Sequence, residues 1–394
     1  MKNKKGFLQG ALCGALAMLL VAGLVSCGLK VNNGNSDITS KTEDKISELQ
    51  NLVKKHYMGD VKEKNLEDGI YKGYINGLND PYSVYYNKKE TKELYESTGG
   101  EYSGIGAVMS QNTETGVITL VQIYKDSPAE KAGLKDNDIL YKVEGKEVTG
   151  KDLSKVVSKI KGEKGTTVEL TVLRGENAKE VTVTATRDTV QAQTIEYKLM
   201  DDKIGYIRVS EFDTVTYDQY EEALDDLEKQ GMTGLVVDLR NNPGGSLSTV
   251  CDMLDLMLPK GLIVYTEDKD GKKTEMKSDE EHQFTKPLAV LVNGNSASAS
   301  EIFAGAIKDY QYGTLIGTKT FGKGIVQSVR QLSDGSAIKL TTAKYYTPKG
   351  NYIHEVGIEP DVELEYEYTG DKNADYDKAY DNQIQKAIEI LNNK

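Results

Sequence analysis

The spacing of apolar residues predicts helices at the beginning of the chain body and near its end. In the first stretch, the positions spaced as on one helix face are Ile46, Leu49, Leu52 and Val53. A second periodic stretch covers residues 66–78 and stops at the turn signal Asn79-Asp80-Pro81. We therefore expect a small helical region over residues 43–100, and a closing helix at Tyr376–Leu391 within residues 371–394.

Between residues 101 and 187 the pattern changes to short β-rich runs. Val117–Ile123 and Thr167–Leu173 are expected to be strands, and Lys151–Ile160 between them has helical spacing. We therefore expect a compact mixed domain at residues 101–187.

From residue 188 to residue 370 the pattern is typical of an α/β domain. The expected buried strands are Ile204–Val209, Gly234–Leu239 and Leu288–Val292, and Tyr217–Lys229 is an expected acidic helix. Glycine-rich corners directly follow two of these strands, at Asn241–Gly245 and at Asn293–Asn295. Because α/β folds bind ligands where strands end in such corners, we expect the functional site there.

Charge and histidine spacing exclude several classes of function. The formal net charge of −12 and the pI near 5.0 provide no basic surface field, so nucleic acid is not expected as a partner. The histidines are His56, His282 and His354, and none has the HExxH or Cys/His spacing of a metal site. We therefore expect no metal and no cofactor.

The N-terminus has the order of an export signal or a membrane anchor. Basic lysines precede the apolar run Phe7–Val25, which ends in Leu24-Val25-Ser26-Cys27 and there resembles the bacterial lipobox. Residues 1–27 are expected to be a lipoprotein signal with lipidation at Cys27, or an uncleaved anchor long enough to span a bilayer. Residues 28–42 are polar and expected to be a tether. Either alternative predicts an extracytoplasmic protein anchored to the bacterial cell membrane.

Lys323 lies in a segment that nearly matches a phosphate-binding loop. Gly317–Lys323 satisfies the first seven positions of the pattern G-x-x-x-x-G-K-[ST], but Gly324 stands where a hydroxyl would hold the metal. Ile325–Val329 is also expected to be a strand, whereas phosphates need a helix N-terminus. Lys323 is thus either a solvated surface lysine or a lysine held against a buried strand. In an apolar pocket, desolvation would leave the amine neutral near pH 7 and able to act as a general base.

A candidate nucleophile lies upstream, in the serine-rich segment Ser296–Ser300. This segment connects the strand Leu288–Val292 to a helix expected to run to Tyr310. Free backbone N–H groups and the positive end of the helix dipole at such a position can stabilise an oxyanion. Serines before a helix also act as N-caps, so at least one of the three is expected to have only that role.

Several segments, in order, resemble a PDZ domain over residues 101–187. They are Tyr102–Ala107 (YSGIGA), Ser127–Leu134 (SPAEKAGL) and Asp138–Leu140 (DIL). Glycines in the first segment would let backbone N–H groups converge on the terminal carboxylate of a peptide, and the strand that follows could pair with that peptide. The expected peptide-binding residues are Gly104, Ile105, Gly106 and Ala107.

Further motifs resemble the carboxyl-terminal processing proteases, the S41 family of serine peptidases. They are GLNDPYSVYY, DLRNNPGG, SASASEIFAGAIKDY, TFGKGIVQ and VGIEPDV, in a match from Gly77 to Asp361. The resemblance implies Ser298 as the nucleophile, Lys323 as the base and Gln327 as the residue that orients the lysine. If the strand continues through Gln327, the two side chains share a face, and a neutral amide carbonyl can accept a lysine N–H. No histidine is expected near either glycine corner, which agrees with a Ser/Lys dyad.

The resemblance also implies an oxyanion hole made by the backbone N–H groups of Ala299 and of a glycine in the Asn241–Gly245 corner. We favour Gly245 over Gly244 for the second donor. Glycine is needed where a substrate backbone must approach closely, and the alternative is that Gly244-Gly245 is only a tight turn.

Together these features predict a multidomain α+β and α/β protein. The expected order is an N-terminal helical segment, a PDZ domain and an α/β peptidase core with the ββα spiral of ClpP and crotonase. The expected function is that of a membrane-tethered serine endopeptidase that recognises C-terminal tails of polypeptide substrates through its PDZ domain and processes or degrades them. The alternative is a catalytically inactive PDZ scaffold that binds peptides in the envelope. The sequence leaves open whether the protein forms a homodimer and whether it needs an activator protein. It also leaves open whether the PDZ domain inhibits the active site or recruits substrate.

Overall fold

The computed structural model describes residues 38–175, 177–279, 281–371 and 376–393. Contacts divide the chain into two compact units, residues 1–67 and 68–394, and each is described by itself. The predicted signal with Cys27, and residues 28–37 of the predicted tether, lie outside the described residues. Within the described part of the chain, no helix combines the length and apolar character that a membrane span requires.

Helices begin the described chain, as the periodicity predicts. Helix α2 covers Ile38–His56, and α3 covers Glu63–Asn76 across the boundary of the two units. In the second unit, strand β1 (Val84–Tyr86) leads into α4 (Lys88–Gly99). The Asn87 side chain accepts two backbone hydrogen bonds from the first turn of α4 and thereby caps this helix.

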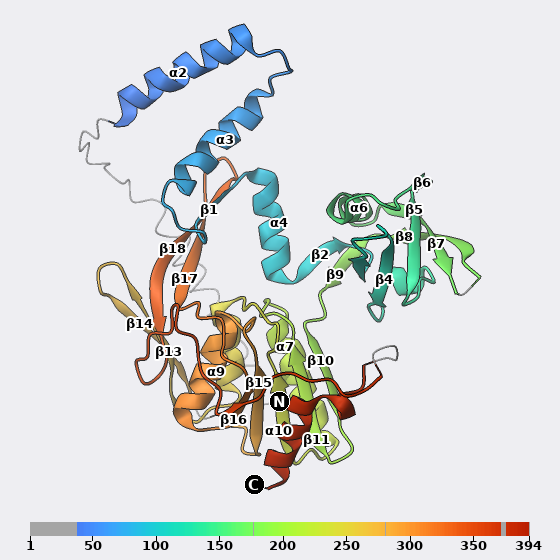
Figure 1. Ribbon diagram of the computed structural model, residues 1–394, viewed down its shortest axis with the longest axis vertical. Coiled ribbons are helices and arrows are strands. Elements are labelled where there is room, and N and C mark those ends of the chain that lie inside the picture. Colours follow the sequence, from blue (N-terminus) through green and yellow to red (C-terminus); the bar gives the residue numbers. More distant parts are fainter. Residues whose placement is uncertain (1–37, 176, 280, 372–375, 394) are drawn as a thin grey trace, which may run out of the picture. The chain divides into compact units, whose positions relative to one another are not determined.

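Residues 101–191 form a β-rich domain with its own apolar core (Figure 1). Strand β2 (Glu101–Gly104) pairs with β9 (Asp188–Gln191), so the two ends of the domain meet. The remaining strands form a sheet in the order β3-β4-β5-β7-β8, with β6 beside β5. Their bounds are Ala107–Gln111, Ile118–Ile123, Asp138–Val143, Thr167–Arg174, Lys179–Thr186 and, for β6, Lys146–Glu147. The helices of the domain are α5 (Pro128–Lys131) and α6 (Leu153–Ile160).

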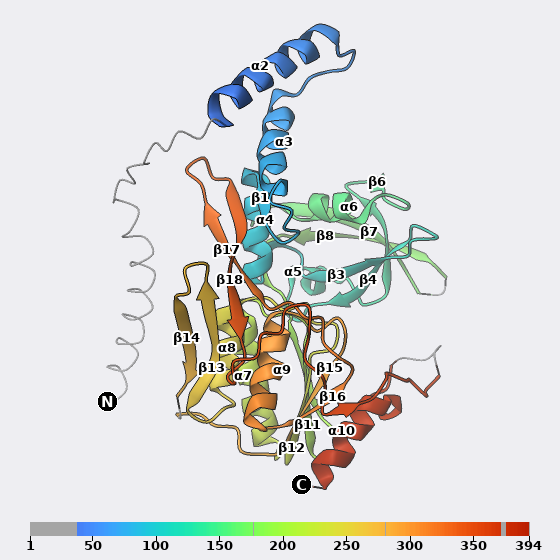
Figure 2. The same ribbon diagram turned by 60° about the vertical axis from the view of Figure 1, so that its left-hand side comes forward.

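The C-terminal core is built on a sheet in the order β10-β11-β12-β15-β16-β19. The strands cover Ile195–Leu199, Ile204–Val209, Gly234–Asp238, Leu288–Val292, Thr314–Gly317 and Val362–Glu363. Strand β10 is antiparallel to β11, and the other neighbours are parallel. Helices α7 (Thr216–Lys229), α8 (Leu247–Asp255) and α9 (Ala299–Tyr310) pack on one face, and α10 (Asn382–Asn392) on the other (Figures 1 and 2). Because both faces are covered, β12 and β15 are buried at every position.

A second sheet of the core has the order β1-β18-β13-β14, with β17 beside β18. Its bounds are Gly261–Asp268 for β13, Lys273–Ser278 for β14, Ile325–Gln331 for β17 and Ala337–Tyr346 for β18. Strand β1 pairs with the beginning of β18, Val84 opposite Lys339. This pairing brings the turn before β1 to the strands that follow Lys323.

The closing helix is shorter than its predicted range, Tyr376–Leu391. Residues Lys378–Tyr380 form a separate 3-10 turn, and α10 begins only at Asn382. The Asp381 side chain accepts hydrogen bonds from the backbone N–H groups of Gln383 and Ile384 and so sets the start of the helix. A capping aspartate between two periodic segments interrupts what apolar spacing alone predicts as one helix.

Candidate active site

The two glycine-rich corners meet because β12 and β15 are parallel neighbours in the core sheet. The Asn241 N–H donates to Asn293 Oδ1 at 3.0 Å, and Asn293 Nδ2 donates to Asn241 Oδ1 at 3.0 Å. The Asn295 side-chain amide donates to Asn241 Oδ1 at 2.9 Å. These mutual hydrogen bonds hold the corners together at the carboxyl ends of the strands, where the sequence predicts the site.

The structure separates the three serines of the segment Ser296–Ser300 by their hydrogen bonds. The Ser296 hydroxyl donates to the Leu239 carbonyl at 2.8 Å, and the Ser300 hydroxyl donates to the Asn242 carbonyl at 2.9 Å. Both side chains are fully buried and tie the start of α9 to the neighbouring corner. The protons of these two hydroxyls are therefore committed, whereas the Ser298 hydroxyl donates no hydrogen bond among the described residues.

The backbone of Ser298 has an unusual conformation at the N-terminus of α9. Its φ of 57° and ψ of −113° lie outside the regions that a serine normally adopts. Such a conformation costs on the order of 1–3 kcal/mol, so the surroundings must hold it. The Tyr345 hydroxyl contributes by donating to the Ser298 carbonyl at 3.1 Å.

A buried carboxylate, Glu301, connects the turn of Ser298 to the loop of Lys323. Its Oε2 accepts the backbone N–H of Ser298 at 2.9 Å and that of Lys323 at 2.8 Å. Its Oε1 accepts the Thr320 hydroxyl at 2.6 Å and the Gly322 N–H at 2.7 Å. One side chain thus fixes both predicted catalytic residues through their backbones.

Sequence reasoning missed Glu301, although a signal for it was present. A glutamate three residues after a serine at a helix start matches the capping-box pattern. Its carboxylate does accept the N–H of Ser298, as that pattern predicts. The further hydrogen bonds from residues 320–323 join segments that are distant in sequence, so no local pattern could indicate them.

Lys323 is half-buried, with its Nζ 4.9 Å from the centre of the Tyr82 ring. Burial lowers the pKa of Lys323, and the neighbouring Lys339 ammonium lowers it further. Glu301 and Asp80 act in the opposite direction, without cancelling the effect. A lysine of lowered pKa is more readily neutral at moderate pH, as a general base must be. Among the hydrogen bonds of the described residues, none joins the Lys323 ammonium to the Ser298 hydroxyl.

Gln327 lies on β17, and its hydrogen bonds among the described residues do not include one to Lys323. Its Nε2 donates to the Thr341 hydroxyl on β18 at 3.3 Å. The β17–β18 pairing shifts in register between Val326 and Gln327. Because of this irregularity, simple strand alternation does not decide whether Lys323 and Gln327 share a face.

A histidine lies beside the lysine loop, which sequence spacing did not indicate. His354 Nδ1 accepts the Gly324 N–H at 3.4 Å, and its ring centre is 6.0 Å from that of Tyr352. Within the described part of the chain, His354 makes no hydrogen bond with Ser298. Its position nevertheless makes His354 the control residue for any test of a lysine base.

The glycine corner lies against the predicted nucleophile. A Cβ on Gly244 would be 2.8 Å from the Ser298 Cβ and 2.9 Å from the Ala299 nitrogen, and Gly244 has a φ of 107°. The Gly244 N–H donates to Asn242 Oδ1 at 2.8 Å. The N–H groups of Gly245 and Ala299 make no hydrogen bond within the described residues, so both are free to donate to a ligand.

The predicted peptide-binding loop lies between β2 and β3 of the N-terminal β-rich domain. Gly106 has a φ of 77°, and a Cβ there would lie 2.5 Å from the Ser127 Cβ, so this position requires glycine. Ile105 is buried, and Ala107 begins the edge strand β3. The N–H groups of Ile105 and Gly106 make no hydrogen bond among the described residues. These N–H groups can therefore donate to a carboxylate, and β3 can pair with a peptide strand.

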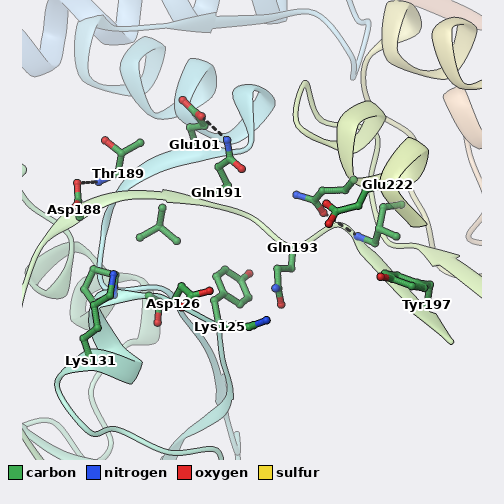
Figure 3. Close-up of a pocket in the computed structure, with 16 residues that line it drawn as sticks. Glu101, Lys125, Asp126, Lys131, Asp188, Thr189, Gln191, Gln193, Tyr197 and Glu222 are labelled. Carbon is green, nitrogen blue, oxygen red and sulfur yellow. Dashed lines mark hydrogen bonds between the residues drawn. The ribbon is translucent and has the colours of Figure 1, made fainter. Parts of the chain in front are cut away.

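A separate cavity of about 780 Å³ lies next to β9 and β10 (Figure 3). Its walls include Tyr124, Lys125 and Asp126 after β4, and Gln193 and Tyr197. Because none of its lining residues belongs to the Ser298 or Lys323 segments, this cavity is not the place of the predicted reaction. Among the described residues, no group of acidic, histidine or cysteine side chains has the arrangement of a metal site.

Comparisons with known proteins match three parts of the chain. The sequence profile of peptidase family S41 matches residues 203–364, that of the PDZ domain matches residues 119–174, and that of the N-terminal domain of the activating protease CtpB matches residues 26–91. The first match includes the segments of Ser298 and Lys323, the second lies within the β-rich domain without reaching the loop Gly104–Ala107, and the third overlaps the helical region.

Relatives are found in Bacillus subtilis. The carboxy-terminal processing protease CtpA is 37% identical over 374 residues, which cover 92% of this chain and 80% of that protein. The carboxy-terminal processing protease CtpB is 37% identical over 359 residues, covering 90% and 73%. Among solved structures, a Bacteroides fragilis protein assigned to the S41 proteases has a TM-score of 0.52 at 17% identity, covering 82% of this chain and 90% of that chain. The last match supports the fold alone.

Proposed function

Because this chain belongs to the carboxy-terminal processing proteases of peptidase family S41, we propose that it cleaves polypeptides with Ser298 as nucleophile and Lys323 as general base. The two family profiles matched by this chain confirm the predicted order of a PDZ domain ahead of an S41 peptidase core. The observation that carries the assignment is the Glu301 carboxylate, which accepts the N–H groups of both residues. A shared buried anchor is what a nucleophile and its base need to keep a constant separation.

In the proposed reaction, the neutral Lys323 amine removes the hydroxyl proton while Ser298 Oγ attacks the scissile carbonyl carbon. The resulting ammonium then gives its proton to the leaving amine as the C–N bond breaks, which leaves an ester on Ser298. A water molecule, deprotonated by the again neutral amine, then attacks the ester carbonyl carbon. The bond to Ser298 Oγ breaks, this oxygen takes the proton back from the Lys323 ammonium, and the carboxylic acid product leaves. Because the base must be neutral, the rate is expected to rise with pH through the lowered pKa of Lys323.

The proposed oxyanion hole consists of the N–H groups of Ala299 and Gly245. Both are without a hydrogen-bond partner in the described residues, and the corner lies against the Ser298 turn. Gly244 is less suited as a donor because its N–H is already committed to Asn242. Its role is to let the corner approach Ser298, where a side chain would collide.

The proposed substrates are polypeptides with exposed C-terminal tails, bound through the loop Gly104–Ala107 and strand β3. Free N–H groups and an edge strand at this position support the assignment. The proposal also places the enzyme outside the cytoplasm, tethered to the membrane by lipidated Cys27 or by an uncleaved anchor. The basic and apolar order of residues 1–27 supports this part, and mass spectrometry of the mature N-terminus tests it.

The dyad is tested with the full-length protein and a peptide that ends in apolar residues and a free carboxylate. Cleavage products are identified by mass for the parent protein and for Ser298→Ala, Lys323→Ala and His354→Ala. We expect internal cleavage by the parent, none by the first two variants, and retained cleavage by His354→Ala. If Ser298→Ala still cleaves the peptide, Ser298 is not the nucleophile. If His354→Ala loses as much turnover as Lys323→Ala, Lys323 is not established as the general base.

Recognition of tails is tested with the same peptide carrying an amidated C-terminus. The N–H groups of Ile105 and Gly106 need a carboxylate to bind, so amidation is expected to raise KM markedly. An unchanged rate would point to a protease that ignores tails. Tail binding without cleavage by any form of the protein would favour the inactive scaffold.

A further inference from the structure

The Lys323 side chain lies against an aromatic ring that comes from a distant part of the chain. Lys323 Nζ is 4.9 Å from the centre of the Tyr82 ring, and both residues are half-buried. Tyr82 belongs to the turn before β1, ahead of the PDZ domain, whereas Lys323 precedes β17 in the peptidase core. A residue from outside the core thus contributes to the surroundings of the proposed base.

The turn that carries Tyr82 is fixed to the core by its own hydrogen bonds. Asp80 Oδ1 accepts the Tyr82 N–H at 3.0 Å, and Asp80 Oδ2 accepts the hydroxyl of buried Ser83 at 2.6 Å. The Ser83 hydroxyl in turn accepts the Thr341 N–H of β18 at 3.2 Å, and β1 then pairs antiparallel with β18. The position of the ring is therefore set by the turn and the strand, independently of the lysine.

The lysine is held from the opposite end. Glu301 accepts the N–H groups of Gly322 and Lys323 at 2.7 Å and 2.8 Å, which fixes the backbone of the lysine loop. Among the described residues, Lys323 Nζ makes no hydrogen bond and no ion pair, and the Tyr82 ring is the aromatic group above it. The amine is thus anchored through its backbone and covered at its tip by the ring.

The ring has two opposing effects on the amine. Its face attracts an ammonium, which favours the charged form, whereas its bulk keeps water away, which favours the neutral form. Burial is the largest cause of the lowered pKa of Lys323, and the ring is part of what buries the amine. We therefore expect removal of the ring to raise the pKa of Lys323.

We propose that Tyr82 is a positioning residue for the reaction, whose ring covers the Lys323 amine and keeps bulk water away from the base. The inference rests on the proposed Ser298/Lys323 dyad and adds the residue that shields its base. When the amine takes the serine proton, the face of the same ring also stabilises the ammonium that forms.

Ionisable groups on several elements surround the amine. After burial, the next effect on its pKa comes from Lys339 on β18, which lowers it, whereas Glu301 on α9 and Asp80 in the turn raise it. His354 lies beside the lysine loop and accepts the N–H of its last glycine. Substitution of Tyr82 leaves all of these groups in the protein, so a shift of the pH profile reports on the ring.

The first experiment measures kcat and KM against pH for three substitutions of Tyr82 in the full-length protein, using the tail peptide. For Tyr82→Ala we expect the rising limb to move up by about one pH unit, which lowers kcat about tenfold below the pKa, while KM and the plateau stay within about threefold of the parent. The Tyr82 hydroxyl makes no hydrogen bond among the described residues, so Tyr82→Phe is expected to match the parent. Tyr82→Leu keeps an apolar cover and should lie closer to the parent than to Tyr82→Ala.

The matched control is Tyr86→Ala. Tyr86 ends β1, and its ring lies against a different lysine, with Lys339 Nζ 5.6 Å from the ring centre. The same segment therefore carries a second contact of the same kind, away from the proposed base. The pH profile of Tyr86→Ala is expected to match that of the parent. Equal shifts in Tyr86→Ala and Tyr82→Ala would indicate a general loosening of β1 and overturn the inference.

The second experiment reads the lysine without turnover, in the Ser298→Ala background. Acetic anhydride acetylates only the neutral amine, so the extent of labelling at Lys323 against pH, measured by mass spectrometry of the peptide that contains it, follows its ionisation. Added Tyr82→Ala is expected to move the labelling midpoint up by about one pH unit and to speed labelling above the midpoint, because the amine is uncovered. An unchanged midpoint and rate would overturn the inference.

Failure of the inference and failure of the proposed dyad give different results. If Ser298→Ala or Lys323→Ala still turns over the peptide, the dyad itself is wrong. If both are inactive while Tyr82→Ala keeps the parent profile, the dyad stands and only the role of Tyr82 is refuted. A rate of Tyr82→Ala above that of the parent at every pH would show that the ring holds the lysine back, which also refutes this role.

Circular dichroism at the assay temperature verifies that each variant is folded. If Tyr82→Ala is not folded, Tyr82→Gln takes its place in both experiments. Its polar side chain lets water reach the amine, so the same shifts are expected, and a profile equal to that of Tyr82→Phe would overturn the inference.

Discussion

Replacing Glu301 by glutamine is the most informative perturbation of the site. The carboxylate accepts four hydrogen bonds, from Ser298, Thr320, Gly322 and Lys323. The new side chain in Glu301→Gln has a single oxygen, so its NH₂ end faces groups that are themselves donors. The least costly orientation places the NH₂ group toward Thr320, whose hydroxyl can turn to accept it, and leaves the Gly322 N–H without a partner.

The magnitude follows from the hydrogen bonds that change. An unsatisfied buried N–H costs roughly 1–3 kcal/mol, and losing the charge weakens each remaining hydrogen bond by on the order of 1 kcal/mol. Burying a neutral amide is cheaper than burying a carboxylate, which offsets part of the loss. We expect Glu301→Gln to destabilise the peptidase core by about 3 kcal/mol, which lowers its melting temperature by roughly 6–12 °C.

The assay is calorimetric unfolding of the full-length protein, followed by the cleavage rate as a function of pH. Glu359→Gln is the control, because the Glu359 side chain is 64% exposed and its carboxylate pairs with Lys319 on the surface. Its effect on stability is expected to be below about 1 kcal/mol. Since Glu301 raises the pKa of Lys323, residual activity of Glu301→Gln should rise at lower pH than in the parent. A melting temperature equal to that of Glu359→Gln, with the parent rate, would refute the role of Glu301 as a shared anchor.

The remaining predictions concern positions around the site. Burial raises the pKa of Asp213 to about 7, so its carboxyl group binds a proton more tightly in the folded state than in the unfolded state. The free energy of unfolding therefore falls as the pH rises from about 4 to 7. Asp213→Asn should flatten this part of the stability–pH curve and raise the free energy of unfolding at pH 8 by at most about 4 kcal/mol. Gly244→Ala should lower kcat at least about tenfold, because the new Cβ collides with the Ser298 turn, and a rate equal to the parent would contradict the described corner. Arg240→Ala leaves two buried aspartates, Asp238 and Asp381, without their arginine partner. The free energy of unfolding measured by chemical denaturation should fall by about 3–5 kcal/mol. A denaturation midpoint equal to that of the parent would contradict this prediction.

The regular elements of the core could be predicted because their signals are local. Strands β12 and β15 are buried at every position. In the sequence, β15 is a continuous apolar run and β12 is apolar up to Asp238, and α7 has an acidic outer face. An element whose apolar periodicity is interrupted by a capping residue was predicted less well. The separate start of α10 depends on Asp381, which caps one helix while Arg240 pairs with its carboxylate from far along the chain.

The candidate site could be predicted only where the residues themselves carry the chemistry. Ser298 and Lys323 stand in motifs that resemble those of the S41 family, so the sequence could name both as candidates. Glu301, Asp80 and His354 were not named as site residues, because their partners lie elsewhere in the chain: Thr341 reaches the Asp80 turn across a separation of 258 residues from Ser83. No spacing rule connects positions that distant.

By itself, the sequence determined the order of helices and strands, the glycine-rich corners and the family. These follow from apolar periodicity, from the backbone freedom of glycine and from motifs found along one chain segment at a time. Only the tertiary structure decided which serine keeps a free hydroxyl, which carboxylate anchors the dyad and which residue reaches the Gln327 amide. The reason is physical: a buried polar group must find a partner, and the partners available to it are set by the strands and loops that folding brings together.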